Sequence, residues 1–218
     1  MTIQDIDFGK EVAGIWEQLT DYEENPIEKH RVIPPYFISS ASIKLVIIGQ
    51  DPTIKRADRR KEIDCTLNLN KPGAIREYVK RICSELGISI EEVYATNLFK
   101  YFYTFPPART FPILKDHLQP NLVLLEKELS TIPQCPIITL GEPVLKLLVN
   151  DNANVRDCWG YDKKTSKTSE QFSFIHDKEN KLNRSFFPFC HQPSFARIPF
   201  YKETLDQYID FVKKSKLV

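Results

Sequence analysis

Four short apolar runs, rich in β-branched and aromatic residues, constrain the fold of this chain more than any other feature of its sequence. The runs cover residues 44–49, 93–97, 136–140 and 185–190. Segments of this length and composition are typical of buried strands. Between the runs lie stretches with helical spacing, at residues 74–86, 114–129 and 143–148. Because strands that alternate with helices form parallel sheets, the sequence predicts an α/β fold, a three-layer α/β/α sandwich around a four-stranded parallel sheet.

The remaining segments predict the periphery of this sandwich. Apolar residues three or four apart at residues 8–19 and 201–214 predict two flanking helices. The polar segment 151–183 predicts an irregular excursion with a small hairpin around residues 171–176. At 218 residues the chain is long enough for one substantial core, so we expect a single domain over residues 1–218.

Composition limits the class of protein. The formal net charge is +1, so nucleic-acid binding would need a local basic face instead of bulk attraction. The five cysteines are widely spaced and show no C-x-x-C pairing, which argues against a disulfide framework or a zinc knuckle. The chain has no leader-like start and no apolar run near the roughly 18 residues of a membrane span. We therefore expect a soluble, cytoplasmic monomer with no membrane partner.

Polar side chains follow three of the predicted strands at the point where each strand ends. Asp51 follows the first run, Asn97 closes the second, and His191 follows the fourth. Ligands of parallel sheets bind at this edge, because the loops after the strands converge there. A carboxylate could act as a positioned base, an amide could read the edge of a planar heterocycle, and an imidazole could donate to a developing oxyanion.

Each of these residues also has a purely structural interpretation. Asp51 suits a helix N-cap or a turn, Asn97 suits a turn after a strand, and His191 suits a half-buried, hydrogen-bonded histidine. The glycine-rich motifs of triphosphate-binding and dinucleotide-binding proteins do not occur in the sequence. Taken one at a time, these residues indicate a site at the strand ends and leave its chemistry open.

A basic cluster begins just after Asp51 and should overhang the same crevice. Its members are Lys55, Arg56, Arg59, Arg60 and Lys61. A phosphate backbone could dock there. Runs of this kind are also often simply solvated, and Asp58 and Glu62 dilute this one.

Taken together, four ordered motifs resemble the uracil-DNA glycosylase superfamily over roughly residues 40–215. The motifs are Gly49-Gln50-Asp51-Pro52, Ala95-Thr96-Asn97-Leu98, Ile138-Thr139-Leu140-Gly141 and His191-Gln192-Pro193-Ser194. The first matches the G-Q-D-P of the best-known branch of that superfamily. The resemblance implies a sandwich around a four-stranded parallel sheet and an enzyme that needs no metal or other cofactor. It also implies a DNA substrate whose damaged or deaminated base is flipped out of the stack for excision.

The resemblance also assigns roles within the site. Asp51 would orient or deprotonate water and stabilise the positive sugar ring as the glycosidic bond breaks. His191 would donate to the pyrimidine O2, and Asn97 would bind the Watson-Crick edge of the base. Gln50 would add contacts to the flipped base, and Leu67 occupies roughly the place of an aromatic residue that stacks on the base in the family.

The expected DNA contacts lie on two segments, the basic loop and the segment after the last motif. They are Arg56, Arg59, Arg60, Ser194, Phe195 and Arg197. Phe195 lies where family members carry a loop that wedges into the minor groove and offsets part of the cost of unstacking. Its alternative role is to pack under the last helix.

Two departures from the family pattern affect the base pocket. Thr53 stands where the uracil-specific branch has a tyrosine that obstructs a 5-methyl group, so the substrate range is expected to be broader. The last motif contains an extra residue, and a gapless alignment would put Gln192 at the histidine position. We keep His191 as the expected donor, with Gln192 as the alternative.

A third departure concerns the residue that stacks on the base. The cysteines bear on a separate property of the superfamily, an iron-sulfur cluster. Leu67 is aliphatic, so Phe99 or Phe102 is a candidate for the stacking role instead. Some branches of the superfamily bind an iron-sulfur cluster through four cysteines. The spacing of the cluster ligands along the sequence differs from that of Cys65, Cys83, Cys135 and Cys158, so no cluster is expected.

The sequence leaves three hypotheses about function. The first is a DNA glycosylase that acts on uracil or a related deaminated base. The second is a non-catalytic nucleic-acid-binding protein that kept the fold and the pocket. The third is a hydrolase of free or modified nucleosides, because the same pocket chemistry needs only a flipped or free base.

Overall fold

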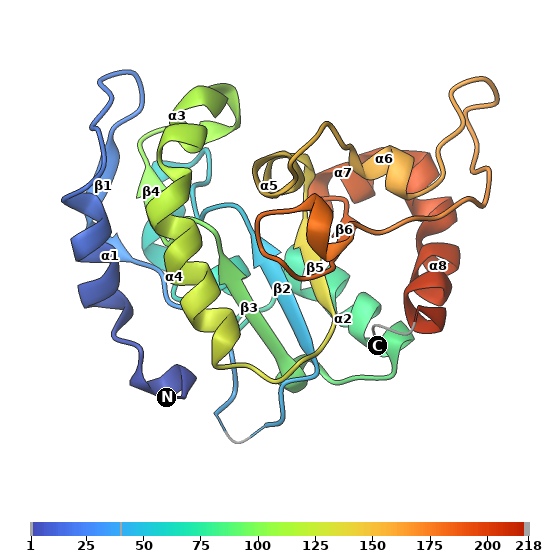
Figure 1. The fold of residues 1–218 in the computed structure, drawn as a ribbon, viewed down its shortest axis with the longest axis horizontal. Helices are drawn as coiled ribbons and strands as arrows, with labels where there is room; N and C mark the ends of the chain where they lie inside the picture. The colour runs from blue at the N-terminus through green and yellow to red at the C-terminus, as the bar shows by residue number, and fades with distance from the viewer. Residues whose placement is uncertain (1, 40, 216–218) are drawn as a thin grey trace.

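A four-stranded parallel sheet lies at the centre of the computed structural model, which describes residues 2–39 and 41–215 (Figure 1). In spatial order its strands are β3 (Val93–Asn97), β2 (Leu45–Gly49), β5 (Ile137–Leu140) and β6 (Phe187–Phe189). All neighbouring strands run parallel. Every strand residue is buried because both faces of the sheet are covered. The predicted fold class is confirmed.

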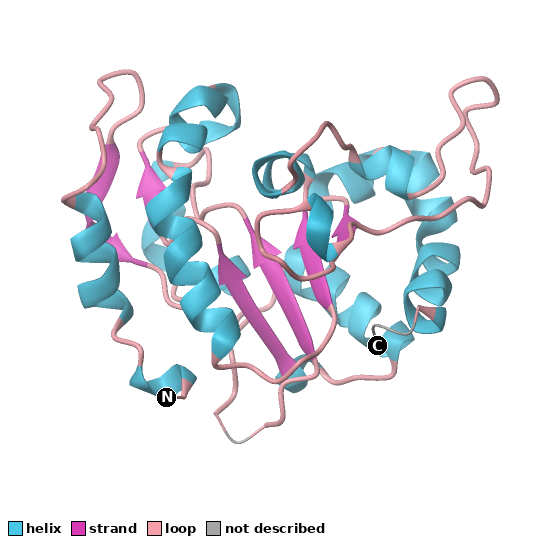
Figure 2. Cartoon of the chain, viewed as in Figure 1, coloured by secondary structure: helices cyan, strands magenta, loops and turns pink. Residues whose placement is uncertain are grey.

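Helices cover both faces of this sheet. They are α1 (Phe8–Trp16), α2 (Ala74–Leu86), α3 (Phe111–Asp116), α4 (Leu118–Ser130), α5 (Glu142–Leu148), α6 (Val155–Cys158), α7 (Gln192–Arg197) and α8 (Pro199–Lys214). Figure 2 shows helices in front of the sheet and behind it, and Figure 1 identifies α4 in front and α2 behind. Helix α8 packs against α2 and α7. One cluster of buried residues extends from Ile3 to Val212.

The helix expected at residues 114–129 is divided in two. Helices α3 and α4 meet at His117, whose ring lies within hydrogen-bond distance of the Tyr103 hydroxyl (3.1 Å) and the Thr20 carbonyl (2.8 Å). Pro120 lies in the first turn of α4 and has no backbone N–H, so one continuous helix through His117 would lack a hydrogen bond at this residue. The expected helix at residues 8–19 ends earlier, at Trp16.

The predicted hairpin around residues 171–176 is wrong. Residues 171–174 have no regular structure, and Ile175 forms an isolated bridge with Phe186. The ring of Phe174 packs against Phe187, and that of Phe172 packs against Tyr208. The segment therefore pairs with the body of the protein instead of with itself.

A second, two-stranded sheet was not predicted. It consists of β1 (Ile27–Val32) paired antiparallel with β4 (Tyr101–Tyr103), with an irregular register. Strand β1 is charged in its middle and largely solvent-accessible, so it lacks the apolar alternation that identifies a strand. Strand β4 follows β3 in the chain, and the loop after β4 lines the site described below.

Buried charges lie between β3 and α4. Lys100 and Glu128 form an ion pair with side chains that are 1% and 0% exposed. Glu128 also accepts hydrogen bonds from the hydroxyls of Tyr94 (2.6 Å) and Thr96 (2.7 Å). Lys100 Nζ donates to the carbonyl of Asn97 at 2.9 Å. The network therefore holds the carboxyl end of β3, where Asn97 lies.

No helix within residues 2–39 and 41–215 is long and apolar enough to cross a membrane.

Removing one member of the buried pair is predicted to destabilise the protein strongly, because the other charge stays buried without a partner. Glu128→Ala should lower the free energy of unfolding by about 3–5 kcal/mol, measured by urea titration. The double variant Lys100→Met/Glu128→Leu should lose less than Glu128→Ala alone. Lys127→Met, which breaks the half-exposed pair with Glu11, is the control and should change stability by no more than about 1 kcal/mol. Equal losses from Glu128→Ala and Lys127→Met would contradict this assignment.

Candidate active site

A cleft with a volume of about 340 Å³ opens at the carboxyl ends of β2, β5 and β6. Among the residues that line it are Gln50, Asp51, Thr53, Leu67, Gly141, Glu142, His191 and Ser194. A neighbouring cavity of about 400 Å³ shares Asp51, Thr53, Leu67 and His191 with the cleft. The loops after three strands therefore converge here, as expected for a parallel sheet.

Asp51 is held by its chain neighbours with both carboxylate oxygens engaged. Gln50 Nε2 donates to Oδ2 and the backbone N–H of Thr53 donates to Oδ1, each at 2.7 Å. Burial raises the pKa of Asp51 to about 6, although these hydrogen bonds and the charge of Arg60 oppose the rise. The carboxylate is therefore oriented, and it is mostly ionised at neutral pH.

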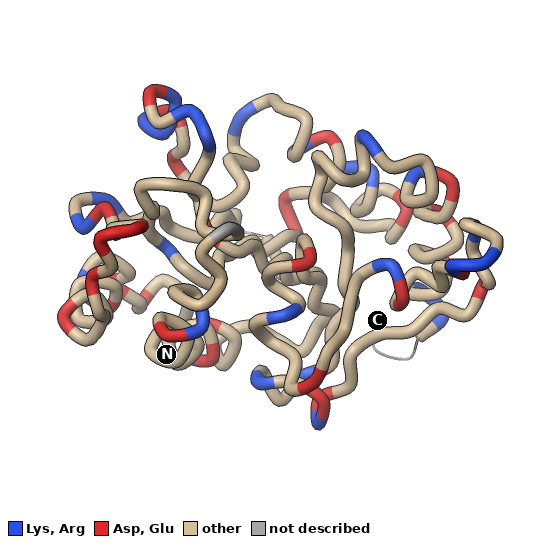
Figure 3. The backbone as a smooth tube through the Cα atoms, turned by 90° about the horizontal axis from the view of Figure 1, so that it is seen from above, with Lys and Arg blue, Asp and Glu red and all other residues tan. Residues whose placement is uncertain are grey.

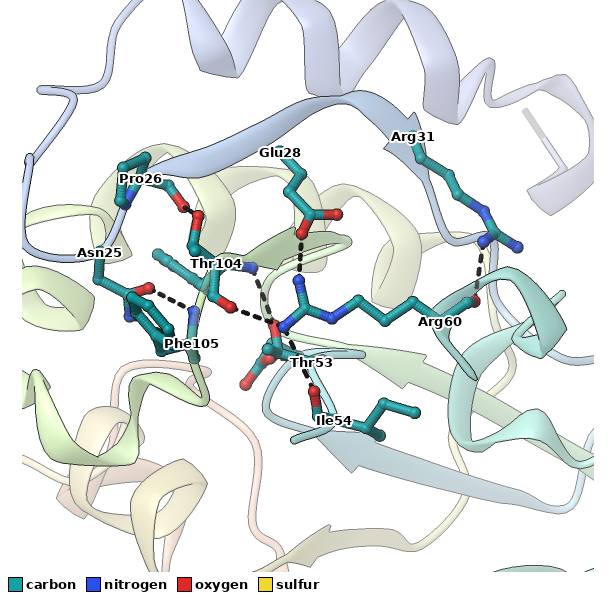
Figure 4. A network of polar contacts seen from close by, with 11 residues as sticks. Asn25, Pro26, Glu28, Arg31, Thr53, Ile54, Arg60, Thr104 and Phe105 are labelled. Atoms are coloured by element: carbon teal, nitrogen blue, oxygen red, sulfur yellow. Dashed lines mark hydrogen bonds and ion pairs between the residues drawn. The ribbon is translucent and has the colours of Figure 1, made fainter. Parts of the chain in front are cut away.

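The loop that carries Asp51 is braced from behind by Arg60 (Figure 4). The Arg60 guanidinium pairs with Glu28 of β1 and donates to the carbonyls of Thr104 (2.7 Å) and Ile54 (3.3 Å). The hydroxyl of Thr53 accepts from the backbone N–H of Tyr103 at 2.9 Å. These contacts tie the loop to both strands of the smaller sheet.

This position corrects the expectation that Arg60 contacts DNA. The residue is 6% exposed, and its guanidinium lies over the ring of Phe102 at 5.7 Å from the ring centroid. A phosphate cannot reach a cation that is buried and already bonded to a carboxylate. Arg60 is a bracing residue of the loop.

His191 lines the same cleft as Asp51. It precedes α7 and lines both cavities, whereas Gln192 lines only the second one. The imidazole is reached by solvent from the cleft, and the surrounding protein lowers its pKa by desolvation. His191 is therefore neutral at neutral pH and can donate one hydrogen bond.

Gly141 makes room for His191. It has φ +101°, which favours glycine, and a Cβ there would lie 3.3 Å from the Cβ of His191. The turn after β5 thus lies close to the histidine, and a side chain at position 141 would crowd it. The L-G turn that was singled out in the sequence has this steric role.

Asn97 ends β3 beside Gly49, its register partner on β2. The residue is 1% exposed, and neither atom of its side-chain amide has a hydrogen-bond partner. A Cβ on Gly49 would collide with Asn97 Oδ1 and lie 3.3 Å from Leu67 Cδ2. Asn97, Gly49 and Leu67 thus meet at one point, although Asn97 itself does not line the cleft.

Leu67 has an unusual backbone. It lies in the short 3-10 segment Thr66–Asn68 with φ +56°, a conformation that is strained for a branched side chain. This segment packs against β3. Leu67 lines both cavities, and its Cδ2 lies close to Gly49, the register partner of Asn97.

Two of the predicted phosphate contacts are paired with acids close to them in sequence. Arg56 pairs with Asp58 at 2.6 Å, and Arg59 pairs with Glu62 at 3.1 Å, in exposed positions. Seen from above, lysine and arginine are interspersed with aspartate and glutamate (Figure 3). The loop is a mixed-charge rim with exposed guanidinium groups, not a purely basic face. Arg197 is exposed as well.

Phe195 has the packing role, the second of its two expected roles. Its ring stacks on Tyr78 of α2 at a centroid distance of 4.7 Å, and Arg81 lies over it at 5.8 Å. The segment after His191 is helix α7, and Phe195 is partly buried in it instead of projecting from a loop.

Phe99 and Phe102 cannot stack on a base, which corrects the expectation that one of them replaces the stacking aromatic. Both rings are 0% exposed, and Phe99 packs on Tyr101 and Tyr103. Both rings belong to buried hydrophobic clusters.

Sequence reasoning missed one wall of the cleft. Pro106, Pro107 and Ala108 line it from the loop after β4, and Tyr201 lines it from α8. Adjacent prolines mark a loop of restricted conformation, so the Pro106-Pro107 pair was the signal that could have identified this wall.

Comparison of the chain with models of protein families and with curated protein sequences found no match. Over the described residues, no three His, Cys, Asp or Glu side chains form a group that could hold a metal ion.

The raised pKa of Asp51 predicts how stability changes with pH. The unfolded state loses this proton near pH 3.8 and the folded state near pH 6, so stability falls as pH rises through this window. At about 1.4 kcal/mol per pKa unit, the loss is about 3 kcal/mol above pH 6. Asp51→Asn should therefore be more stable than the original protein at pH 8 and similar to it at pH 4, measured by urea unfolding.

Asp58→Asn is the matched control, because the Arg56 hydrogen bond lowers the pKa of the exposed Asp58 carboxyl. This variant should not gain stability as the pH rises. A stability difference between Asp51→Asn and the original protein that did not change with pH would contradict the burial of a titrating carboxyl at position 51.

Proposed function

We propose that this protein is a DNA glycosylase of the uracil-DNA glycosylase type, which hydrolyses the N-glycosidic bond of uracil or a related deaminated base in DNA. The observation that carries the proposal is the juxtaposition in one cleft of an oriented carboxylate, Asp51, and a neutral imidazole, His191. The four ordered motifs support the same class. Titratable groups with shifted pKa values that line one cleft are typical of catalytic sites.

Asp51 is the catalytic carboxylate in this proposal. When the bond to the base breaks, positive charge develops on the sugar ring, and a fixed carboxylate in a site of low polarity stabilises it. The same carboxylate orients the attacking water and accepts its proton. A pKa of about 6 suits this work, because Asp51 is ionised at neutral pH and still basic enough to take a proton.

His191 acts on the leaving base. Negative charge accumulates on the pyrimidine O2 as the bond breaks, and a neutral imidazole donates a hydrogen bond to it. The neutral ring already carries the N–H that donates, so the reaction does not require the protonated, imidazolium form of His191. Gln50 and Ser194 complete the lining on either side of these two residues.

Asn97 reads the base edge. Its amide offers an acceptor and two donors, and the burial of these atoms without partners is costly unless a ligand satisfies them. A base reaches the amide after Leu67 moves aside. The small Thr53 next to Asp51 leaves space for a substituent at the 5 position, so thymine mispaired with guanine belongs in the substrate panel.

A second candidate function, hydrolysis of free nucleosides, is favoured by the pairing of Arg56 and Arg59 with Asp58 and Glu62. A DNA enzyme needs phosphate contacts from its rim, and a nucleoside hydrolase does not. Charge reversal of Arg56 and Arg59 should therefore cripple excision from oligonucleotides and spare hydrolysis of a nucleoside. Lys44→Glu is the control, because Lys44 precedes β2 at the opposite edge of the sheet.

The proposal predicts base excision that depends on Asp51. End-labelled oligonucleotides with uracil, hypoxanthine, xanthine or a G·T mismatch, single and double stranded, should yield alkali-sensitive abasic sites on at least one substrate. Asp51→Asn should slow the cleavage by about 100-fold to about 10,000-fold, because it removes both the base and the negative charge. Excision at the unaltered rate by Asp51→Asn would refute the mechanism. Tight DNA binding without abasic sites would support a non-catalytic protein.

The two pKa shifts predict the pH dependence of turnover. Asp51 must be ionised, so kcat/KM, which reports the protein without substrate, should rise with pH through about 6. His191 works as the neutral form, and its lowered pKa keeps it neutral above that range. The pH profile of kcat/KM should therefore rise once and stay flat to about pH 9. A bell-shaped profile with a fall near pH 7 would show that imidazolium is required.

A further inference from the structure

The loop after β4 presents an aromatic ring to solvent at the edge of the cleft. Phe105 is 61% exposed, and its chain neighbours Pro106 and Pro107 line the cleft. Among residues 2–39 and 41–215, no other phenylalanine, tyrosine or tryptophan is classed as exposed. Single exposed apolar side chains are common on protein surfaces, but this ring lies next to residues that line the cleft, where a flat apolar face can contact a ligand.

The backbone of Phe105 is fixed although its ring is free. Its N–H donates to Asn25 Oδ1 at 2.7 Å, and its carbonyl accepts from Asn25 Nδ2 at 3.0 Å (Figure 4). Asn25 is 1% exposed. On the preceding residue, the N–H of Thr104 donates to Pro26 O at 2.9 Å and its carbonyl accepts from Arg60. The buried amide of Asn25 and the buried guanidinium of Arg60 thus hold the backbone that carries the ring, although the ring itself contributes little to the core.

The same arginine braces the Asp51 loop, as Figure 4 shows. Arg60 reaches Ile54 on one side and Thr104 on the other, so the position of the exposed ring is coupled to that of the catalytic carboxylate. The other aromatic candidates are occupied, since Phe99 and Phe102 are buried and Phe195 is stacked on Tyr78.

We propose that Phe105 stacks on the nucleobase next to the excised nucleotide in the substrate strand. When a nucleotide is flipped out, its neighbour loses a stacking partner on one face, and a flat ring on a fixed backbone replaces it. This inference rests on the proposed function and deepens it. The substrate is then a polynucleotide strand, because a free nucleoside has no neighbouring base.

The test uses a single-stranded oligonucleotide with uracil next to 2-aminopurine, whose fluorescence falls when it is stacked. The Asp51→Asn protein is the background, so that the strand is bound while excision of its uracil is slow. Adding Phe105→Ala should weaken binding by about 5-fold to about 150-fold and make the bound 2-aminopurine brighter. Phe105→Trp should keep the affinity and the low fluorescence, because it keeps a flat aromatic face.

Two controls separate stacking from other effects. Phe105→Leu keeps an apolar side chain without a flat ring, so it should bind nearly as weakly as Phe105→Ala. Val123→Ala removes another exposed apolar side chain, 55% exposed in the groove between α1 and α4, and should change neither signal. Thermal unfolding of Phe105→Ala should match that of the parent, because little of the ring is buried.

The outcomes distinguish this inference from the proposed function. If the protein with Asp51 excises uracil but Phe105→Ala changes neither the affinity nor the 2-aminopurine signal, the inference is overturned and the glycosylase proposal stands. If no base is excised but both signals change with Phe105→Ala, the ring binds a strand and the proposed chemistry fails. Absence of oligonucleotide binding to the Asp51→Asn protein would overturn the inference.

Discussion

The pairing of four parallel strands in register is the constraint on which the rest of this structure depends. It brings the ends of β2, β3 and β5 to one edge, so that Gly49 faces Asn97 and the turn at Gly141 approaches His191. Side chains that are far apart in the sequence are thereby concentrated around one cleft. Burial at this edge then raises the pKa of Asp51 and lowers that of His191, which gives both groups the protonation states that the proposed chemistry uses.

A second layer of buried polar contacts holds this arrangement. Arg60 joins the Asp51 loop to Glu28 and to the rim loop at Thr104, and the Lys100–Glu128 pair fixes the carbonyl of Asn97. Such groups are costly to bury, and here their hydrogen bonds hold strand β3 and the loops around the cleft. In the proposed function they act as supports, because a flipped base must be met by groups that are already in place.

The main sheet was predictable because its strands are continuous apolar runs, which is the pattern that burial on both faces produces. Asp51 and His191 were predictable as neighbours for the same reason, since each follows a strand. Strand β1 was not, because its side chains are charged and largely accessible, and its pairing with β4 is a long-range contact. The role of Arg60 was predicted wrongly because a run of charged residues does not indicate which of them pairs with a buried carboxylate. Phe105 was overlooked because its exposure depends on how its loop is anchored.

Isotope labelling during base release tests the central claim most directly. An oligonucleotide with the preferred base is incubated with the protein in ¹⁸O-water. The masses of the free base and of the abasic oligonucleotide are then measured by mass spectrometry. Hydrolysis assisted by Asp51 predicts that the free base is released without label, that the abasic sugar carries one ¹⁸O from water, and that the Asp51→Asn protein forms both products far more slowly. An oligonucleotide that stays intact, or a label in the released base, would contradict the account.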